Sequence, residues 1–399
     1  MQDSPRPHRL AFFVLALMAA AAAGSQPEKP RARDLGVPFD GTPGPLNAIT
    51  DVAGVTVGHT TLMTGSGKLQ TGRGPVRTGV TAVLPRGSDT LMNPVFAAWF
   101  AQNGNGEMTG TAWVEESGFL EGPVMITNTH SVGVVRDAVI RWRVSHAGPD
   151  ATGFYWSLPV VAETWDGWLN DINGFHVTAE HAVHALDSAR GGRVEEGSVG
   201  GGTGMICNGY KGGIGTSSRR LEAKDGGYTV GVLVQCNYGT RDNLRIAGIP
   251  VGREIPAPEP YVFLPSDIAE HGSIIVVVAT DAPLLPHQLK RLDHRVTLGL
   301  GRNGSISGNE SGDIFIAFST ANPSASAPAS VAGLNMLRND FLDPLFRATV
   351  EATEESIVNA MVGAEDMTGI DGHRVIALPH AALRAVLKKY GRLSAATSR

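Results

Sequence analysis

The stretch that decides the fold lies at residues 272–284, which read GSIIVVVATDAPL. The run 274–278 is entirely β-branched, which is typical of a strand buried on both faces. Repeated prolines and scattered charges between Pro256 and Gly272 predict an exposed loop just before that strand. On local sequence alone, Ser273 is most simply a residue that opens a strand. A self-cleaving hydrolase, however, would release a new N-terminal serine at such a junction, and its α-amine, with a pKa of about 8 in water, would serve as base for the hydroxyl.

Short strands and longer helices alternate along the rest of the chain. Helical periodicity marks residues 132–144, 178–189, 286–300 and 348–363. Strands are predicted at residues 55–57, 78–85, 122–127, 204–207, 228–235, 313–320 and 374–378. The first of these strands is expected to stop at a turn around His59, to which we assign no role. The mixture predicts a layered α/β sandwich that folds as one unit.

Length and charge describe an ordinary globular protein. The chain has 399 residues, 42% of them hydrophobic, and a net charge of −5. Acidic and basic residues are interleaved and form no basic stripe, so we expect no nucleic-acid partner.

The N-terminus has the pattern of a secretory signal peptide. Arg6 and Arg9 precede an apolar run over 10–18, and alanines and other small residues follow up to Ser25. This arrangement predicts a signal peptide over residues 1–24 and a periplasmic or secreted protein. The apolar run is short for a bilayer span and no later segment reaches that length, so we expect no membrane partner after the signal is removed.

Two cysteines are present, Cys207 and Cys236. Export would permit a disulfide between them. Both lie in apolar, strand-like segments, and we therefore expect two free buried thiols.

Several segments, spread in one order over nearly the whole mature chain, carry a family resemblance. They are residues 47–59, 158–164, 199–205, 211–219, 273–284 and 311–313. In these segments the chain resembles the self-processing L-aminopeptidase/D-esterase family, and within it the β-peptidyl aminopeptidases. The resemblance implies an αββα sandwich of the N-terminal-nucleophile type, related to the ornithine acetyltransferase fold. It also implies an α-chain over 25–272 and a β-chain over 273–399 that form one folded unit, and a homotetramer of such αβ units.

The same resemblance assigns the nucleophile and the oxyanion site. Cleavage between Gly272 and Ser273 would free Ser273 as the nucleophile. Asn237, in the segment QCN at 235–237, matches the side chain that stabilises the oxyanion. The loss of one such donor typically costs about 100- to 1,000-fold in rate. Without the resemblance, Asn237 is more simply a turn residue.

Three further residues match the family's site. Ser311 and Asp313 match a polar pair that orients the nucleophile and its amine, with Asp313 standing where β-peptidyl relatives carry glutamate. Glu163 matches the residue that holds the free amino group of the substrate. Trp165 lies near the position where some relatives carry a catalytic tyrosine, and we assign it no role in proton transfer. No metal or organic cofactor is implied.

The expected activity is the release of N-terminal residues, β-amino acids foremost, from short peptides, amides or esters. One alternative is an acyltransferase on the ornithine acetyltransferase fold, against which the serine and the signal peptide both count. Another is an exported binding protein that keeps the fold without the chemistry. A single uncleaved chain on a denaturing gel would favour that last alternative.

Overall fold

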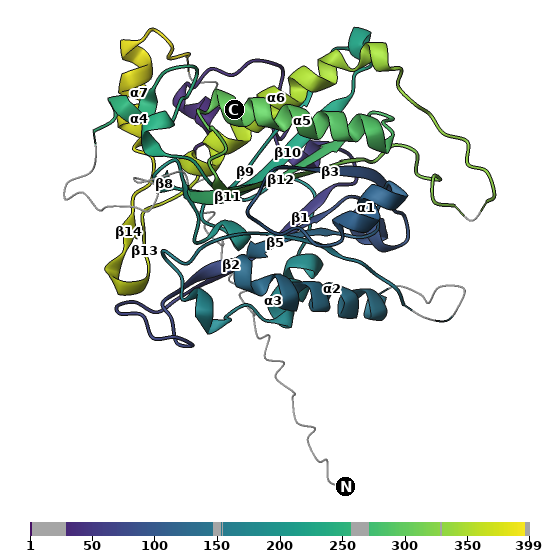
Figure 1. The fold of residues 1–399 in the computed structure, drawn as a ribbon, viewed down its shortest axis with the longest axis horizontal. Coiled ribbons are helices and arrows are strands. Elements are labelled where there is room, and N and C mark those ends of the chain that lie inside the picture. Colours follow the sequence, from purple (N-terminus) through teal and green to yellow (C-terminus); the bar gives the residue numbers. More distant parts are fainter. Residues whose placement is uncertain (2–28, 147–152, 154, 257–270, 328, 396–399) are drawn as a thin grey trace.

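The structure is a computed structural model that describes residues 1, 29–146, 153, 155–256, 271–327 and 329–395. The predicted signal peptide, apart from Met1, and nearly all of the predicted loop before Gly272 lie outside the described residues. Two β-sheets lie face to face, and helices cover the outer face of each sheet (Figure 1). The predicted αββα sandwich is confirmed.

The larger sheet has six strands in the order β4-β3-β12-β11-β10-β9. Its strands are β3 (Val95–Gly104), β4 (Phe119–Leu120), β9 (Gly213–Arg220), β10 (Thr229–Asn237), β11 (His271–Thr280) and β12 (Glu310–Ser319). Strands β11 and β12 are parallel, whereas β10 is antiparallel to β11. The β-branched run 274–278 therefore has a strand on each side, and it is fully buried.

The smaller sheet has four strands in the order β1-β2-β5-β6. They are β1 (Thr56–Thr64), β2 (Val76–Leu84), β5 (Val124–Asn128) and β6 (Val160–Thr164). Two short hairpins complete the strands: β7 (Ile206–Cys207) with β8 (Tyr210–Lys211), and β13 (Met367–Thr368) with β14 (Arg374–Val375).

The long helices form the two outer layers. Helices α5 (Pro286–Arg302) and α6 (Asp343–Val362) pack on the larger sheet, and α2 (Val132–His146) and α3 (Ala179–Asp187) pack on the smaller one. Shorter helices are α1 (Thr111–Ser117), α4 (Val251–Glu254) and α7 (His380–Lys389). Within the described ranges, no helix combines the length and the hydropathy needed to cross a bilayer.

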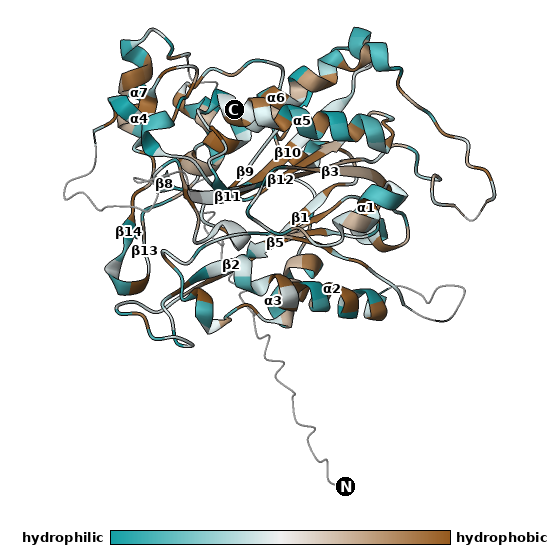
Figure 2. Ribbon diagram, in the orientation of Figure 1, coloured by the Kyte–Doolittle hydropathy of each residue, from teal (hydrophilic) through white to brown (hydrophobic). Residues whose placement is uncertain are grey.

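Alternation of side chains along β11 divides the buried residues between two cores. Ile274 and Val276 pack in the core under α5 and α6, whereas Ile275 and Val277 pack in the core between the two sheets. A third cluster lies between the smaller sheet and α2 and α3. In Figure 2 the central strands are largely brown, in agreement with these cores. Odd-numbered side chains of β11, including that of Ser273, thus face the smaller sheet.

Several strand predictions need correction. Strand β1 does not stop at His59 but runs to Thr64, paired with β2 along its whole length. Strands β3, β6 and β9 were not predicted, and the predicted strands 204–207 and 374–378 are shortened to two residues each, in β7 and β14. The four predicted long helices are all present, each within a few residues of its expected bounds.

Candidate active site

Ser273 lies near the start of β11, in the middle of the larger sheet. It is directly opposite Asn237 of β10 and beside Gly312 of β12. Because it shares the face of Ile275, its side chain points toward the smaller sheet. The residue is only 5% exposed, and what remains accessible opens into a cavity.

The cavity has a volume of about 460 Å³ and draws its walls from both sheets. Its lining residues are Asn105, Gly106, Glu107, Thr129, Glu163, Trp165, Gly272, Ser273 and Glu310. Both residues of the predicted cleavage bond and the predicted amine-binding carboxylate therefore share one cavity.

Gly272 has a backbone conformation that other residues rarely adopt. Its φ is +125°, and a Cβ built on it would lie 2.0 Å from the carbonyl oxygen of Asn237. A side chain there would be strained by its φ and would also collide with the backbone of β10. Glycine is thus required directly before Ser273.

Glu163, one residue before the end of β6, is a buried carboxylate on the opposite wall. It is 4% exposed, and its two carboxylate oxygens accept hydrogen bonds from the Glu107 N–H at 3.0 Å and from the Thr129 hydroxyl at 2.5 Å. Burial raises the pKa of Glu163, while these two donors act in the opposite direction. A positive group entering the cavity would relieve the cost of burying this charge.

The Asn237 side chain is held at both ends. Its Oδ1 accepts the Ile206 N–H at 2.7 Å, and its Nδ2 donates to the Trp165 carbonyl at 2.9 Å. An amide nitrogen carries two N–H bonds, so one remains for another acceptor. Directly opposite residues in an antiparallel pair have Cβ atoms about 4.5–5.5 Å apart. This places the Asn237 amide beside the Ser273 side chain, where a reacting carbonyl would gain negative charge.

Ser311 and Asp313 lie beside the backbone of Ser273 rather than its hydroxyl. In the parallel ladder Gly272 pairs with Ser311, and Ile274 pairs with Asp313. The alternation places Ser311 and Asp313 on the face turned toward α5 and α6, opposite to the Ser273 side chain. Both are fully buried, and the Ser311 hydroxyl donates to Asp313 Oδ1 at 2.6 Å. The register thus places the pair beside the backbone of Ser273, whose nitrogen cleavage would turn into an amine.

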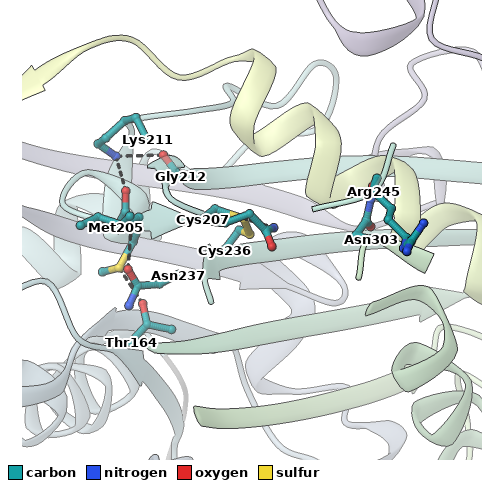
Figure 3. The surroundings of a disulfide bond; sticks show 11 residues. Thr164, Met205, Cys207, Lys211, Gly212, Cys236, Asn237, Arg245 and Asn303 are labelled. Carbon is teal, nitrogen blue, oxygen red and sulfur yellow. Dashed lines mark hydrogen bonds between the residues drawn. A yellow bond between two sulfur atoms is a disulfide. The ribbon is translucent and has the colours of Figure 1, made fainter. Parts of the chain in front are cut away.

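The expectation of two free thiols is wrong. Cys207 and Cys236 form a disulfide, with their Cα atoms 5.5 Å apart (Figure 3). That separation is ordinary for a disulfide. It arises because the β7–β8 hairpin packs against the end of β10. The disulfide therefore joins the residue after Ile206 to the residue before Asn237.

Sequence reasoning missed several residues of the cavity. Thr129 and the Glu107 N–H, which orient the Glu163 carboxylate, carry no local signal, because they lie 34 and 56 residues from it in the chain. Trp165 is 44% exposed and lines the cavity, while its carbonyl accepts a hydrogen bond from the Asn237 amide.

In the described part of the chain, no group of three or more His, Cys, Asp or Glu residues is placed to hold a metal ion.

Comparisons with known proteins agree with this geometry. Residues 47–375 match peptidase family S58. The chain is 56% identical to a beta-peptidyl aminopeptidase BapA from Sphingosinicella microcystinivorans over 98% of this chain and 100% of that protein. It is 48% identical to a protein of the same name from Sphingosinicella xenopeptidilytica over 94% and 95% of the two chains.

A solved structure supports the same assignment. The L-aminopeptidase D-ala-esterase/amidase from Ochrobactrum anthropi superposes with a TM-score of 0.84 at 51% identity, over 92% of this chain and 100% of the other. It is described as a prototype of the serine aminopeptidases and as a variant of the Ntn hydrolase fold. The family resemblance found in the sequence is confirmed: the chain belongs to peptidase family S58 and is an aminopeptidase with an N-terminal-nucleophile hydrolase fold.

Proposed function

We propose that this aminopeptidase activates itself by cleaving the Gly272–Ser273 bond, and that the new N-terminal Ser273 then releases N-terminal residues from short peptides, amides or esters. The observation that carries the proposal is the shared cavity, which brings Ser273 and the buried Glu163 carboxylate to opposite walls of one small space. An α-chain over 25–272 and a β-chain over 273–399 would remain one folded unit, because β10 and β12 flank β11 on either side.

Self-cleavage would begin with the Ser273 hydroxyl. Its oxygen attacks the carbonyl carbon of Gly272, and collapse of the adduct breaks the C–N bond and leaves an ester between the two residues. The proton of the hydroxyl passes to the leaving nitrogen, which becomes the free amine of Ser273. Water then hydrolyses the ester to a carboxylate on Gly272 and the free hydroxyl of Ser273. The Asn237 amide is our proposed donor to the oxyanion.

Turnover would use the same atoms on a foreign substrate. The amine of Ser273 takes the hydroxyl proton as the oxygen attacks the substrate carbonyl, and returns it to the leaving amine or alcohol. Water hydrolyses the resulting acyl-enzyme. Ser311 and Asp313, beside the Ser273 nitrogen, would keep that amine oriented between cycles.

Glu163 would select substrates with a free N-terminus. Its carboxylate is buried and accepts hydrogen bonds from two neutral donors, the Thr129 hydroxyl and the Glu107 N–H, so a substrate ammonium would add a charged partner. Preference for β-amino acids is supported by the two relatives named beta-peptidyl aminopeptidases at 56% and 48% identity. Export to the periplasm or medium and assembly as a homotetramer of αβ units complete the proposal.

The decisive experiment starts with a denaturing gel and N-terminal sequencing of the purified protein. We expect two fragments, the smaller beginning Ser-Ile-Ile-Val, and activity on β-homo-alanyl, D-alanyl and L-alanyl amides in a panel. Ser273→Ala should remain one chain and be inactive. Ser305→Ala is the matched control, because it alters another Gly-Ser junction of the chain that is followed by isoleucine, and it should be cleaved and active.

Other outcomes separate the alternatives. A fragment beginning Ser-Ile-Ser-Gly would move the nucleophile to Ser305 and refute the site. An uncleaved but active parent would refute self-activation alone. Transfer of the acyl group to an added amine at the expense of hydrolysis would favour the alternative function, an acyltransferase.

A further inference from the structure

Lys211 is a buried cation that the proposed mechanism does not use. It ends the β8 strand and is 0% exposed. Its Nζ donates to the carbonyl oxygens of Met205 at 2.8 Å, Gly212 at 2.9 Å and Gly202 at 3.4 Å. Three carbonyl acceptors match the three N–H donors of an ammonium. Burial lowers the pKa of Lys211 to about 7, and Lys29 lowers it further by a smaller amount. Hydrogen bonds to three carbonyl oxygens favour the charged ammonium.

The hydrogen bond from Lys211 to Met205 connects the ammonium to the side-chain amide of Asn237, the proposed donor to the oxyanion. The Met205 carbonyl that accepts from Lys211 belongs to the same peptide group as the Ile206 N–H. That N–H donates to Asn237 Oδ1 at 2.7 Å, and Asn237 Nδ2 donates in turn to the Trp165 carbonyl at 2.9 Å. Figure 3 shows Lys211, Met205 and Asn237 in this order.

We call this series of hydrogen bonds, from Lys211 through the Met205–Ile206 peptide to Asn237, the relay. Each of its hydrogen bonds has its donor on the side of the ammonium and its acceptor on the side of the Asn237 N–H groups. Aligned hydrogen bonds polarise one another, by about 10–30% per bond in condensed-phase estimates. A positive charge at one end therefore strengthens the Asn237 amide as a donor at the other end. The relay also fixes the plane of the amide, since Oδ1 is held by a peptide that the ammonium itself anchors.

The backbone around the relay is tied in place independently. Cys207 follows Ile206 and Cys236 precedes Asn237, so the disulfide joins the two segments that the Ile206–Asn237 hydrogen bond connects. A rotation of the Met205–Ile206 peptide would break both the ammonium contact and the amide contact. The relay thus has one arrangement in which all its members are satisfied.

We propose that Lys211 is a positioning residue for the reaction: through the Met205–Ile206 peptide its ammonium orients and polarises the Asn237 amide that receives the oxyanion. This inference rests on the oxyanion role proposed above for Asn237. Lys211 lies outside the cavity lining and acts only through Asn237.

The test is a double-mutant cycle with parent, Lys211→Met, Asn237→Ala and the double variant. The readouts are kcat and KM on one amide substrate, normalised to the cleaved fraction of the chain wherever cleavage occurs. Removal of an oxyanion donor costs about 100- to 1,000-fold, and we expect Lys211→Met to lose part of this, about 10-fold in kcat, with KM within about two-fold of the parent. In the Asn237→Ala background the same substitution should change kcat by less than about two-fold, since its target is gone.

Tyr210→Phe is the matched control. Tyr210 neighbours Lys211 in β8, is fully buried and accepts a hydrogen bond from Arg241 at 2.9 Å, but it is not part of the relay. Its loss should lower thermal stability and leave kcat unchanged. If Lys211→Met does not accumulate, Lys211→Gln, which keeps N–H donors without the charge, enters the same cycle.

The outcomes separate the two proposals. If Asn237→Ala lowers kcat and the Lys211 substitution lowers it again by the same factor in that background, the relay is wrong and Asn237 keeps its role. An effect on KM alone, or a Tyr210→Phe loss in kcat equal to that of Lys211→Met, would overturn the relay as well. An Asn237→Ala enzyme with the kcat of the parent would refute the oxyanion role and the relay together.

Discussion

The substitution Glu163→Gln isolates the charge of the proposed amine site. Glutamine has nearly the same shape as glutamate, and its amide oxygen can still accept the Glu107 N–H. The Thr129 hydroxyl, which now donates to the carboxylate, can rotate to accept from the new NH₂ group. The cavity wall should therefore keep its form while the partner for a substrate ammonium disappears.

The expected loss follows from the burial of the site. Glu163 is 4% exposed, so solvent screens its interaction with a bound ammonium only weakly. A hydrogen bond to a charged group contributes about 1.5–3 kcal/mol, which corresponds to about 10- to 150-fold in kcat/KM for a substrate with a free amine. An N-acetylated substrate has no ammonium, so for it Glu163→Gln should not reduce kcat/KM further.

The assay compares kcat/KM of parent and variant on a free amide and its N-acetyl form. Glu107→Gln is the matched control, because it makes the same change on an exposed side chain of the same cavity, where ion pairs contribute about 0–1 kcal/mol. Equal losses on the free and acetylated substrates, or a Glu107→Gln loss as large as that of Glu163→Gln, would refute the reasoning.

The pH dependence gives a second measure of the same group. Burial raises the pKa of Glu163, so its negative charge is complete above that pKa and is lost as pH falls through it. On free-amine substrates kcat/KM of the parent should begin to fall at a pH above the usual range of a glutamate, and Glu163→Gln should lack this inflection. A parent and a variant with the same acidic limb would contradict the assignment.

Three further outcomes are expected. Gly272→Ala should remain one band on a denaturing gel, because alanine at a φ of +125° is strained and its Cβ would collide with the backbone; normal cleavage would contradict this. Replacement of Cys207 and Cys236 by alanine removes a cross-link over 29 residues. In denaturant titrations it should lower the unfolding free energy by about 3–4 kcal/mol. An unchanged midpoint would show that the cross-link does not stabilise the fold. The rate should rise with pH in the neutral to mildly alkaline range as the Ser273 amine loses its proton. Asp313→Asn should lower the pKa of this rise, because removal of a nearby negative charge disfavours the protonated amine. An unchanged profile would show that Asp313 is not coupled to the amine.

Sequence patterns predicted strands that have a clear β-branched run, and they missed strands in which glycines weaken the strand pattern. Strand β11 was clear because its β-branched run fits only a strand buried on both faces. Strand β9 was missed because Gly213 and Gly215 weaken a strand pattern. The structure gives the reason for Gly215: a Cβ there would lie 2.0 Å from the Ser356 carbonyl of α6, so the glycine allows the helix to approach the sheet. In β1, the threonines after His59 suit a turn or a strand equally, and pairing with β2 decides for the strand.

The sequence identified those site residues that lie in recognisable motifs, but it did not predict which of them are neighbours in space. Ser273 and Asn237 were found through separate motifs, but only the register of β10 and β11 makes them direct neighbours. The Cys207–Cys236 bond depends in the same way on how a hairpin packs against β10, which neither cysteine's own segment indicates. Lys211 was matched to the family only as part of a glycine-rich segment, and its contact with the Met205 carbonyl appears only in three dimensions.

The proposed self-cleavage and the proposed turnover of a substrate would use the same cavity in different ways. In the intact chain the Ser273 nitrogen is an amide and cannot accept a proton, and the carbonyl that the proposed self-cleavage attacks belongs to Gly272. Under the proposed self-activation the chain would be its own first substrate, with glycine as an acyl group that has no side chain and no free amine. Self-cleavage would therefore bring no ammonium to Glu163, whereas turnover would bring the ammonium of the substrate. Glu163→Gln should accordingly cleave itself like the parent while losing turnover, whereas Asn237→Ala should be slow in both steps because both form an oxyanion at the same point.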